Sequence, residues 1–383
     1  MSPVASKIAR EITERGAIPF ARFMEIALYC PVYGYYEKEE DTIGRGGDYY
    51  TSVSVGPLFG ELLAWEFARW LGAEPQADGP ASLSASHPGE MLEVVEAGAH
   101  RGDLARDILG WICRYRPALF QRLCYRIIEP SGVRRRWQQE TLAGFASKVT
   151  WSAALGDIAA TPAASGPAGR IIFANELLDA LPVHRLGWDA EQRAWFEWGV
   201  TLEDGGFRWM RLPGPAPCLA AGAPLPFSDE RFSALLPDGF VVELCPSALE
   251  WWRLAADILG RGRLLTFDYG LTADEFLVPE RKNGTLRGYR RHELTGDVLA
   301  SPGEQDITAH VNFTAIQAAG EAVGLQTDGF LTQAQFLTRI AAATWQGDGY
   351  FGDWTARHTR QFQTLTHPDH LGRSFRVLVQ ERS

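Results

Sequence analysis

The residues best suited to do chemistry in this 383-residue chain surround a glycine turn within Met91–Asp103. A short apolar run ends at Glu96, Gly98 and Gly102 bound the turn, and a helical pattern starts at Gly102. Open α/β sheets build nucleotide sites from a strand, a glycine turn and a helix in this order, because the turn brings backbone amides close to the ligand. The sequence therefore predicts a nucleotide-binding turn, although such a turn taken alone is a weak signal.

A carboxylate one strand further along would bind the ribose hydroxyls of such a ligand. Glu129, followed by Pro130, ends the apolar run 124–129 and stands at that position. His100 occupies the middle of the turn, where a glycine would allow close approach of the backbone and a positive φ. We expect either that His100 points away from the ligand or that it weakens binding.

A second polar cluster, Asn175, Glu176 and Asp179, follows the predicted strand 170–174. Ligands of doubly wound sheets bind at the carboxyl ends of strands, so these side chains can line a reaction centre. An equally good interpretation is a helix N-cap at Asn175 followed by two first-turn acids. Asp268 ends another predicted strand, where an ordinary exit into a loop is the favoured interpretation. His310, in a helix-entry turn, is a candidate general base, although a structural role is commoner there.

Alternating strands and helices must position these residues. The apolar pattern predicts strands at 91–96, 124–129, 148–151, 170–174, 240–244, 263–268, 284–292 and 375–379, and helices at 4–30, 57–71, 102–116, 131–143, 247–259, 312–323 and 333–343. This alternation predicts an α/β fold with a parallel, doubly wound sheet, and short alternating runs at about 183–227 predict inserted β-hairpins. We divide the chain into an N-terminal helical or lid region, 1–72, and a cofactor-binding domain, 91–383.

Composition excludes several classes of function. A net charge of −10 argues against a nucleic-acid partner. The five cysteines form no CxxC and have no partnered His, so we expect reduced thiols and no metal site. The first residues do not read as a signal peptide, and no apolar span is long enough for a membrane. A cytoplasmic protein is expected, and a homodimer is one arrangement that the sequence leaves open. The chain also lacks the serine hydrolase, zincin and P-loop motifs.

Further short motifs occur in a fixed order from about Ile18 to Val379. They lie at 31–36, 47–52, 59–63, 96–102, 128–131, 175–183, 268–270, 284–287 and 306–313. This series resembles the MidA-like methyltransferase family, which includes the mitochondrial complex I assembly arginine methyltransferase. The resemblance implies an S-adenosylmethionine-dependent methyltransferase with a Rossmann-like fold, an N-terminal helical part and inserted β-hairpins.

The resemblance also implies roles for individual residues. The cofactor would be bound by Gly47, Asp48, Thr51, Ser52, Glu96, Gly98, His100, Gly102, Glu129 and Pro130. The catalytic candidates are Asn175, Glu176, Asp179 and His310. Methyl transfer is an in-line displacement that depends on alignment. Glu176 and Asp179 can orient a positively charged arginine acceptor, whereas an oxygen acceptor would need a base such as His310 or His100.

Three departures from the family pattern leave alternatives open. His100 replaces a glycine, Ser54 replaces the acid of a Thr-Ser-Pro-Glu motif, and Asn312 stands where Asp is common. We favour an active methyltransferase acting on a protein side chain, possibly arginine, or on a small molecule at oxygen or nitrogen. A weakly active pseudoenzyme that serves as a binding or assembly factor is the second class, and a dinucleotide oxidoreductase is a less favoured third.

Overall fold

A computed structural model of the chain describes residues 1–39, 51–72, 90–159, 167–214, 216–220, 225, 235–290, 293–346 and 351–383. These residues form two compact units, which we describe separately. The first unit comprises residues 1–50, 178–251 and 270–318, and the second comprises 51–177, 252–269 and 319–383. Gly47 and Asp48 lie outside the described residues. The functional division predicted above, with a separate N-terminal lid, stays a prediction.

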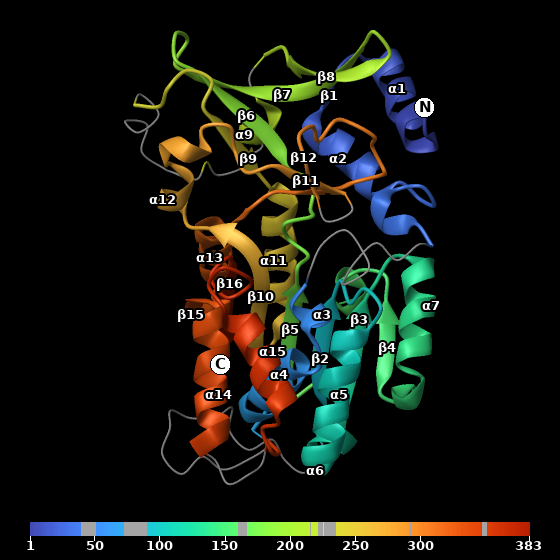
Figure 1. Cartoon of the computed structure of the whole chain (residues 1–383), viewed down its shortest axis with the longest axis vertical. Helices are drawn as coiled ribbons and strands as arrows, with labels where there is room; N and C mark the ends of the chain where they lie inside the picture. Colours follow the sequence, from blue (N-terminus) through green and yellow to red (C-terminus); the bar gives the residue numbers. More distant parts are fainter. Residues whose placement is uncertain are drawn as a thin grey trace. The chain divides into compact units, whose positions relative to one another are not determined.

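The second unit is built on a large mixed β-sheet (Figure 1). Its strands run in the order β15 (Gln326–Thr332), β16 (Phe375–Arg382), β10 (Gly262–Leu271), β5 (Gly169–Asn175), β2 (Leu92–Ala97), β3 (Leu123–Ile128) and β4 (Val149–Ser152). The five strands from β10 to β4 are mutually parallel. The expectation of a wholly parallel sheet is wrong at the other edge, where β16 runs antiparallel to β10 and β15. A strand buried on both faces has the same apolar pattern in either direction, so the sequence did not reveal this reversal.

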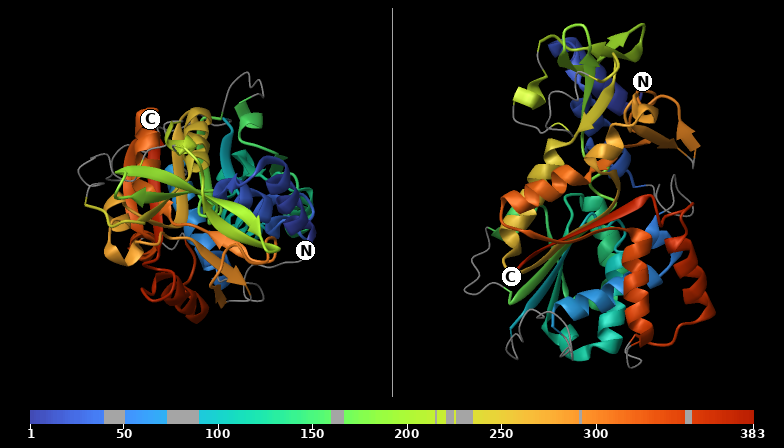
Figure 2. Two further views of the ribbon diagram at one scale, coloured as in Figure 1. Left: turned by 90° about the horizontal axis from the view of Figure 1, so that it is seen from above. Right: turned by 90° about the vertical axis from the view of Figure 1, so that its left-hand side faces the viewer.

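Helices cover both faces of this sheet (Figure 2). The second unit contains α3 (Ser52–Val55), α4 (Leu58–Trp70), α5 (Asp103–Tyr115), α6 (Pro117–Arg122), α7 (Gly132–Thr141), η2 (Ala143–Phe145), α8 (Gly156–Ala159), α14 (Gln333–Gln346) and α15 (Ala356–Thr366). On one face, Phe67 of α4 packs on Phe173 of β5 with ring centroids 5.3 Å apart. On the other face, Trp252 of α11 (Pro246–Leu259) donates a hydrogen bond to Gln380 of β16 at 2.7 Å. Burial on both faces fixes the strand ends that carry the candidate residues.

The first unit holds two antiparallel sheets. One contains β1 (Ile18–Pro19), β7 (Ala194–Glu203), β6 (His184–Asp189) and β9 (Val241–Leu244), with β8 (Gly206–Arg211) paired to β7; the other contains β12 (Glu293–Thr295), β11 (Arg287–Arg290) and β13 (Asp306–Thr308). The β-hairpins expected at 183–227 are therefore present. However, β9 was expected in the parallel sheet and instead pairs with β6.

The remaining elements surround these sheets or join the two units. They are α1 (Pro3–Arg15), α2 (Phe20–Tyr29), η1 (Tyr35–Glu37), α9 (Pro217–Ala220), α12 (Ala273–Phe276), η3 (Pro279–Arg281), β14 (Val311–Asn312) and α13 (Phe313–Ala322). The single helix predicted at 4–30 is wrong. Gly16, with φ of 81°, ends α1, and the extended strand β1 separates it from α2. Three elements, α11, β10 and α13, contribute residues to both units.

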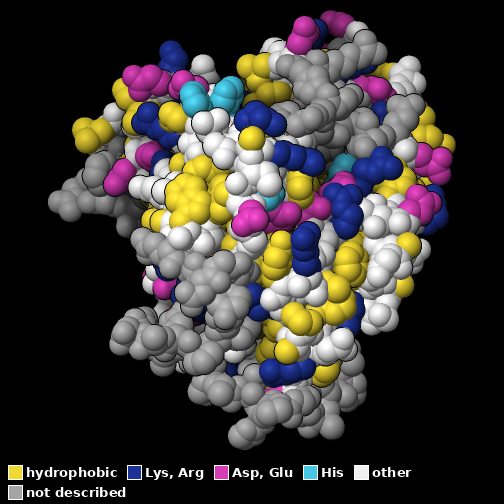
Figure 3. Space-filling view, turned by 60° about the horizontal axis from the view of Figure 1, so that its bottom comes forward, with side chains coloured by type: hydrophobic (Ala, Val, Ile, Leu, Met, Phe, Trp, Pro, Cys, Tyr) yellow, Lys and Arg dark blue, Asp and Glu magenta, His cyan; other side chains and the backbone are white. Residues whose placement is uncertain are grey.

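Two surface properties bear on the expected partners. None of the helices in the described part of the chain has the length and apolar character needed to span a bilayer. On the face drawn in Figure 3, acidic and basic side chains of the described residues are interspersed instead of gathering in one basic area. The absence of a nucleic-acid partner stays a prediction.

Candidate active site

The turn between β2 and α5 has the backbone conformation that a cofactor-binding glycine turn needs. Gly98, His100 and Gly102 all have positive φ, at 75°, 46° and 85°. A Cβ atom added to Gly98 would lie 3.0 Å from Cδ1 of Leu177, in the loop after β5. Gly98 is therefore favoured by its conformation, and an added Cβ would also crowd the end of the Leu177 side chain. Since α5 begins directly after Gly102, the N–H groups of its first turn lack intrahelical acceptors and can bind an anion or a polar ligand.

His100 adopts the left-handed conformation that the sequence argument expected its side chain to disfavour. Such a conformation costs a non-glycine residue on the order of 1–3 kcal/mol, although His is among the residues that tolerate it better. Helix α7 supports His100 twice. Its carbonyl oxygen accepts a hydrogen bond from Nε2 of Gln138 at 3.0 Å, and its ring lies edge-on to that of Trp137, with centroids 6.0 Å apart. The side chain is thus accommodated without loss of the turn.

Gln138 connects the turn to the ends of two strands. This fully buried residue of α7 also donates to Oε2 of Glu129 at 3.1 Å and accepts from Nε1 of Trp151 at 2.9 Å. Its amide is therefore bonded at both its nitrogen and its oxygen. Sequence reasoning missed Gln138, because a glutamine within the polar run 134–141 gives no sign that it is buried.

The Glu129 carboxylate is held in one orientation at the end of β3 by two hydrogen bonds. Its side chain is buried, and its Oε1 accepts a hydrogen bond from the backbone N–H of Ser131 at 2.9 Å. Together with Gln138, this fixes both carboxylate oxygens in orientation. Glu129 therefore has the place and the rigidity expected of a ribose-binding acid, with Pro130 continuing the chain away from β3.

Glu96 is a buried acid behind the turn. Burial raises the pKa of its carboxyl to about 7, although a hydrogen bond donated by the Tyr125 hydroxyl acts to lower it. This bond is 2.6 Å long and joins β2 to β3. The Glu96 carboxyl therefore keeps its proton at a higher pH than an exposed glutamate does.

The loop after β5 is tied to the neighbouring strand β10. Glu176 has φ of 53°, and its N–H donates to the carbonyl of Phe267 at 2.8 Å. The next N–H, of Leu177, donates to the Asp268 carboxylate at 3.3 Å. Residues 176–181 form bends and turns, so the interpretation of Asn175 as a helix N-cap is wrong. Asp268, expected to be an ordinary strand exit, is a fully buried anchor of this loop.

The carboxylate of Glu176 is oriented by two donors from different segments. Its Oε1 accepts from the backbone N–H of Ser52 at 3.2 Å and from the side-chain amide of Asn175 at 3.1 Å. Ser52 is in turn anchored, because its hydroxyl donates to Gln333 at 2.9 Å and Gln333 donates to the carbonyl of Leu365 at 3.0 Å. The structure thus brings Ser52, Asn175 and Glu176 together, while the roles that the family resemblance implies for them stay predictions.

Thr51 and Ser54 explain how this segment tolerates the missing acid. Thr51 is the N-cap of α3, and Ser54 stands where the family pattern has glutamate. The Thr51 hydroxyl accepts from the Ser54 N–H at 3.1 Å, and the Ser54 hydroxyl accepts from the Thr51 N–H at 3.1 Å. This reciprocal pair is a capping box made without a charged group.

The other two catalytic candidates belong to the first unit. Asp179 is buried, and its carbonyl accepts from the N–H of Ala309 at 2.9 Å. His310 borders a pocket that is also lined by Glu243, Cys245 and Asn312. Burial lowers the pKa of His310 to about 4, with the charge of Arg287 as the next cause, so its imidazole is neutral at neutral pH.

The site geometry is that of a nucleotide-type cofactor turn with an oriented carboxylate beside it, and comparison with known proteins decides the family. A family model of S-adenosyl-L-methionine-dependent methyltransferases matches residues 67–331. This chain belongs to that family.

Similar proteins agree. The chain is 27% identical to the mitochondrial protein arginine methyltransferase NDUFAF7 homolog of Drosophila melanogaster, over 98% of this chain and 84% of the relative. It is 29% identical to mitochondrial protein arginine methyltransferase NDUFAF7 of Danio rerio, over 88% of this chain and 76% of the relative. A crystal structure of a COG1565 superfamily member from Burkholderia thailandensis, bound to S-adenosyl-homocysteine, superimposes with a TM-score of 0.78 at 32% identity, covering 99% of this chain and 92% of that one.

The protein is therefore a methyltransferase that uses S-adenosylmethionine, as the sequence series predicted. One expectation is overturned. The curated relatives are mitochondrial proteins by name, which contradicts the cytoplasmic location expected from the sequence.

Proposed function

We propose that this methyltransferase transfers a methyl group to an arginine side chain of a protein substrate. The observation that carries the proposal is the Glu176 carboxylate, which the Ser52 N–H and the Asn175 amide orient at the carboxyl end of β5. A carboxylate held in one orientation suits the planar, positively charged guanidinium, whose N–H groups bind carboxylates through paired hydrogen bonds. The names of the curated relatives, protein arginine methyltransferases, support the same acceptor.

We also propose how the second unit binds its cofactor. The turn from Glu96 to Gly102 would lie against the methionine part, and Glu129, followed by Pro130, would hold the ribose hydroxyls. Thr51 and Ser52 would help to cover the cofactor. The three positive φ angles of the turn and the two hydrogen bonds that fix Glu129 support this arrangement. Five parallel strands, with this turn following the middle one, support a Rossmann-like description of the sheet.

When bound, S-adenosylmethionine supplies an electrophilic methyl group, and its transfer to a guanidinium nitrogen releases S-adenosyl-homocysteine and one proton. The residues of this chain would contribute alignment and electrostatics. Glu176 would hold the guanidinium so that one nitrogen points at the methyl carbon, which matters because an in-line displacement is sensitive to orientation. The positive φ of Glu176 and the Asp268 contact to the next residue fix the main chain at this point, and the hydrogen bonds from Ser52 and Asn175 orient the carboxylate itself. Roles for Asp179 and His310, and a homodimer, stay predictions.

An oxygen acceptor is less well supported by the described residues. Its deprotonation calls for a base whose pKa lies near the working pH. His310 and His100 were the candidates, and burial lowers the pKa of His310 to about 4, which makes its imidazole a weak base.

The test compares matched peptides with the untagged full-length protein and S-adenosylmethionine carrying an isotopic label in its methyl group. One peptide set contains Arg, and the control set has Lys at the same positions. We expect methylarginine in the first set and no label in the second. Label found on lysine, or on small molecules of an extract in place of arginine, would contradict the proposal.

The role of Glu176 is tested separately with Glu176→Gln. We expect turnover on the arginine peptide to fall on the order of a hundredfold, as when one oriented polar group of an active site is removed. Binding of S-adenosyl-homocysteine, measured by calorimetry, should stay within about twofold of wild type. Glu14→Gln, at an exposed position of α1, is the matched control and should change neither quantity. Equal turnover in Glu176→Gln and wild type would remove Glu176 from the mechanism.

A further inference from the structure

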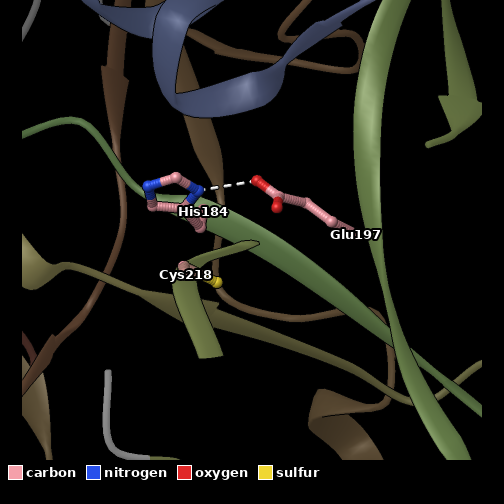
Figure 4. Close-up of side chains that lie close together, drawn as sticks. All are labelled: His184, Glu197 and Cys218. Carbon is pink, nitrogen blue, oxygen red and sulfur yellow. Dashed lines mark hydrogen bonds and ion pairs between the residues drawn. The ribbon is translucent and has the colours of Figure 1, made fainter. Parts of the chain in front are cut away.

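Three side chains with metal-binding atoms meet in the first unit, and none of them has a part in the methyl transfer proposed above. His184 lies on β6, Glu197 on β7 and Cys218 on α9 (Figure 4). One donor atom from each lies within 4.8 Å of the other two. The register of the two strands explains part of this, because Leu186 pairs with Glu197. His184, two positions before Leu186, therefore lies on the same face as Glu197 and diagonal to it.

The Glu197 carboxylate points to a missing partner. Its side chain is 1% exposed, and one of its oxygens, Oε1, lies 2.6 Å from Nδ1 of His184. The other oxygen, Oε2, is buried and has no hydrogen-bond partner among the described residues. A buried carboxylate oxygen without a partner is costly, and native structures rarely leave one. An ion bound at this point would satisfy that oxygen.

The set of donors fits zinc. An imidazole nitrogen, a carboxylate oxygen and a thiolate sulfur are its usual ligands in proteins. With bonds of about 2.0–2.3 Å and tetrahedral angles, the ligand atoms of zinc are roughly 3.3–3.8 Å apart. The observed cluster is within 4.8 Å, so small side-chain rotations bring the three atoms to that spacing. The thiolate also favours zinc over calcium and magnesium, which prefer oxygen ligands.

Charge and access agree with the same ion. A carboxylate and a thiolate neutralise the two positive charges of Zn²⁺, which lowers the cost of holding these groups in a buried place. Glu197 and Cys218 are buried, whereas the His184 side chain is 26% exposed. The exposed part of the imidazole is the side from which a water molecule would join as the fourth ligand.

We propose that His184, Glu197 and Cys218 bind one zinc ion, with water completing the tetrahedron. The ion takes the place of the hydrogen between Nδ1 of His184 and the Glu197 carboxylate, so the imidazole binds it as the tautomer protonated at Nε2. It displaces the thiol proton of Cys218 to solvent, and Oε2 of Glu197 turns toward the ion. The ion cross-links β6, β7 and α9 through their side chains, and it holds residues 184 to 218 in a closed loop in addition to the packing of this segment. The function of this site is structural in the first unit and separate from the residues proposed for methyl transfer.

The test uses the untagged full-length protein, because a histidine tag would itself bind zinc. Protein stripped with a chelator and dialysed is titrated with Zn²⁺ in competition with a chromophoric chelator, and bound metal is measured by mass spectrometry. Wild type should bind one equivalent. Cys218→Ser and Glu197→Gln should each weaken binding by at least about a hundredfold, since even residues behind the ligands change zinc affinity ten- to a hundredfold. Cys113→Ser, at an exposed cysteine, is the matched control and should bind as wild type does.

A second measurement keeps the proposal testable if a variant fails to fold. X-ray absorption on zinc-loaded wild-type protein should show one sulfur at about 2.3 Å and nitrogen or oxygen ligands at about 2.0–2.2 Å. Cobalt in place of zinc should give a thiolate-to-metal absorption band, and Cys218→Ser should lack it. Less than half an equivalent of zinc on folded wild type, a metal shell without sulfur, or a cobalt–thiolate band that persists in Cys218→Ser would each overturn the proposal.

Discussion

The glycine turn of the second unit and the His184–Glu197–Cys218 cluster of the first unit are made in opposite ways. The shape of the turn is set by the main chain, because it follows from the φ angles of Gly98, His100 and Gly102. The cluster depends on side chains, which come from two paired strands and from the helix α9 that follows them in the sequence. The turn could be recognised from the order of residue types alone. The cluster could not, since its spacing follows from strand register and from the position of α9, which the sequence does not display.

The largest expected effect comes from adding one methyl group to the turn. Gly98→Ala would place a Cβ atom 3.0 Å from Leu177 at a φ of 75°. We expect the turn to shift and the affinity for S-adenosyl-homocysteine to fall by about a hundredfold, which corresponds to about 3 kcal/mol of strain. Calorimetric titration measures this.

Gly110→Ala is the matched control, because Gly110 lies in α5 with open space around its Cβ position. It should leave the affinity unchanged. Cys218→Ser disrupts the His184–Glu197–Cys218 cluster and should also leave the affinity for S-adenosyl-homocysteine unchanged, which would show that the two regions act independently. If Gly98→Ala binds the cofactor as wild type does, the φ angles of the turn do not determine cofactor affinity.

The pH dependence of the free energy of unfolding tests whether the buried Glu96 side chain, behind the turn, contributes to stability. The pKa of Glu96 is raised from 4.5 to about 7 by burial, so the folded state binds this proton more tightly than the unfolded state does. The stabilisation is complete below pH 4.5 and is lost as the pH rises through about 7, and it amounts to roughly 3 kcal/mol. Glu96→Gln should remove this part of the dependence.

The measurement is the free energy of unfolding by urea at a series of pH values. The difference between wild type and Glu96→Gln is the relevant quantity, because other groups titrate equally in both proteins. A difference that does not change with pH would show that Glu96 stays charged in the folded protein.

A smaller effect is expected at Gln138, which joins the turn to Glu129 and Trp151 through side-chain hydrogen bonds. Gln138→Ala would leave these buried groups without their partner, at a cost of about 1–3 kcal/mol. Both the melting temperature and the affinity for S-adenosyl-homocysteine should fall. Gln139→Ala, on the exposed side of the same helix, serves as the control. If the two variants have the same melting temperature and the same affinity for S-adenosyl-homocysteine, the main chain alone holds the conformation of the turn.

The same distinction explains what could be predicted from the sequence. Helices and strands with a clear period were found, and the ordered motifs identified the family and its cofactor. The reversal of β16 and the membership of β9 were missed, because a buried apolar run carries no information on direction or partner. The roles of Gln138 and Asp268 were missed too. Each becomes evident only when a distant backbone N–H or carbonyl lies beside it.

One contact of the Glu176 carboxylate has a consequence for any mutational survey of this enzyme. The donor from residue 52 is a main-chain N–H, so replacing the Ser52 side chain deletes the anchor to Gln333 but leaves the donor itself in place. Alanine scanning would therefore measure the contribution of the Ser52 hydroxyl and would miss that of its main-chain N–H. Ser52→Pro removes that hydrogen and is the substitution that would show how much the orientation of Glu176 owes to the backbone.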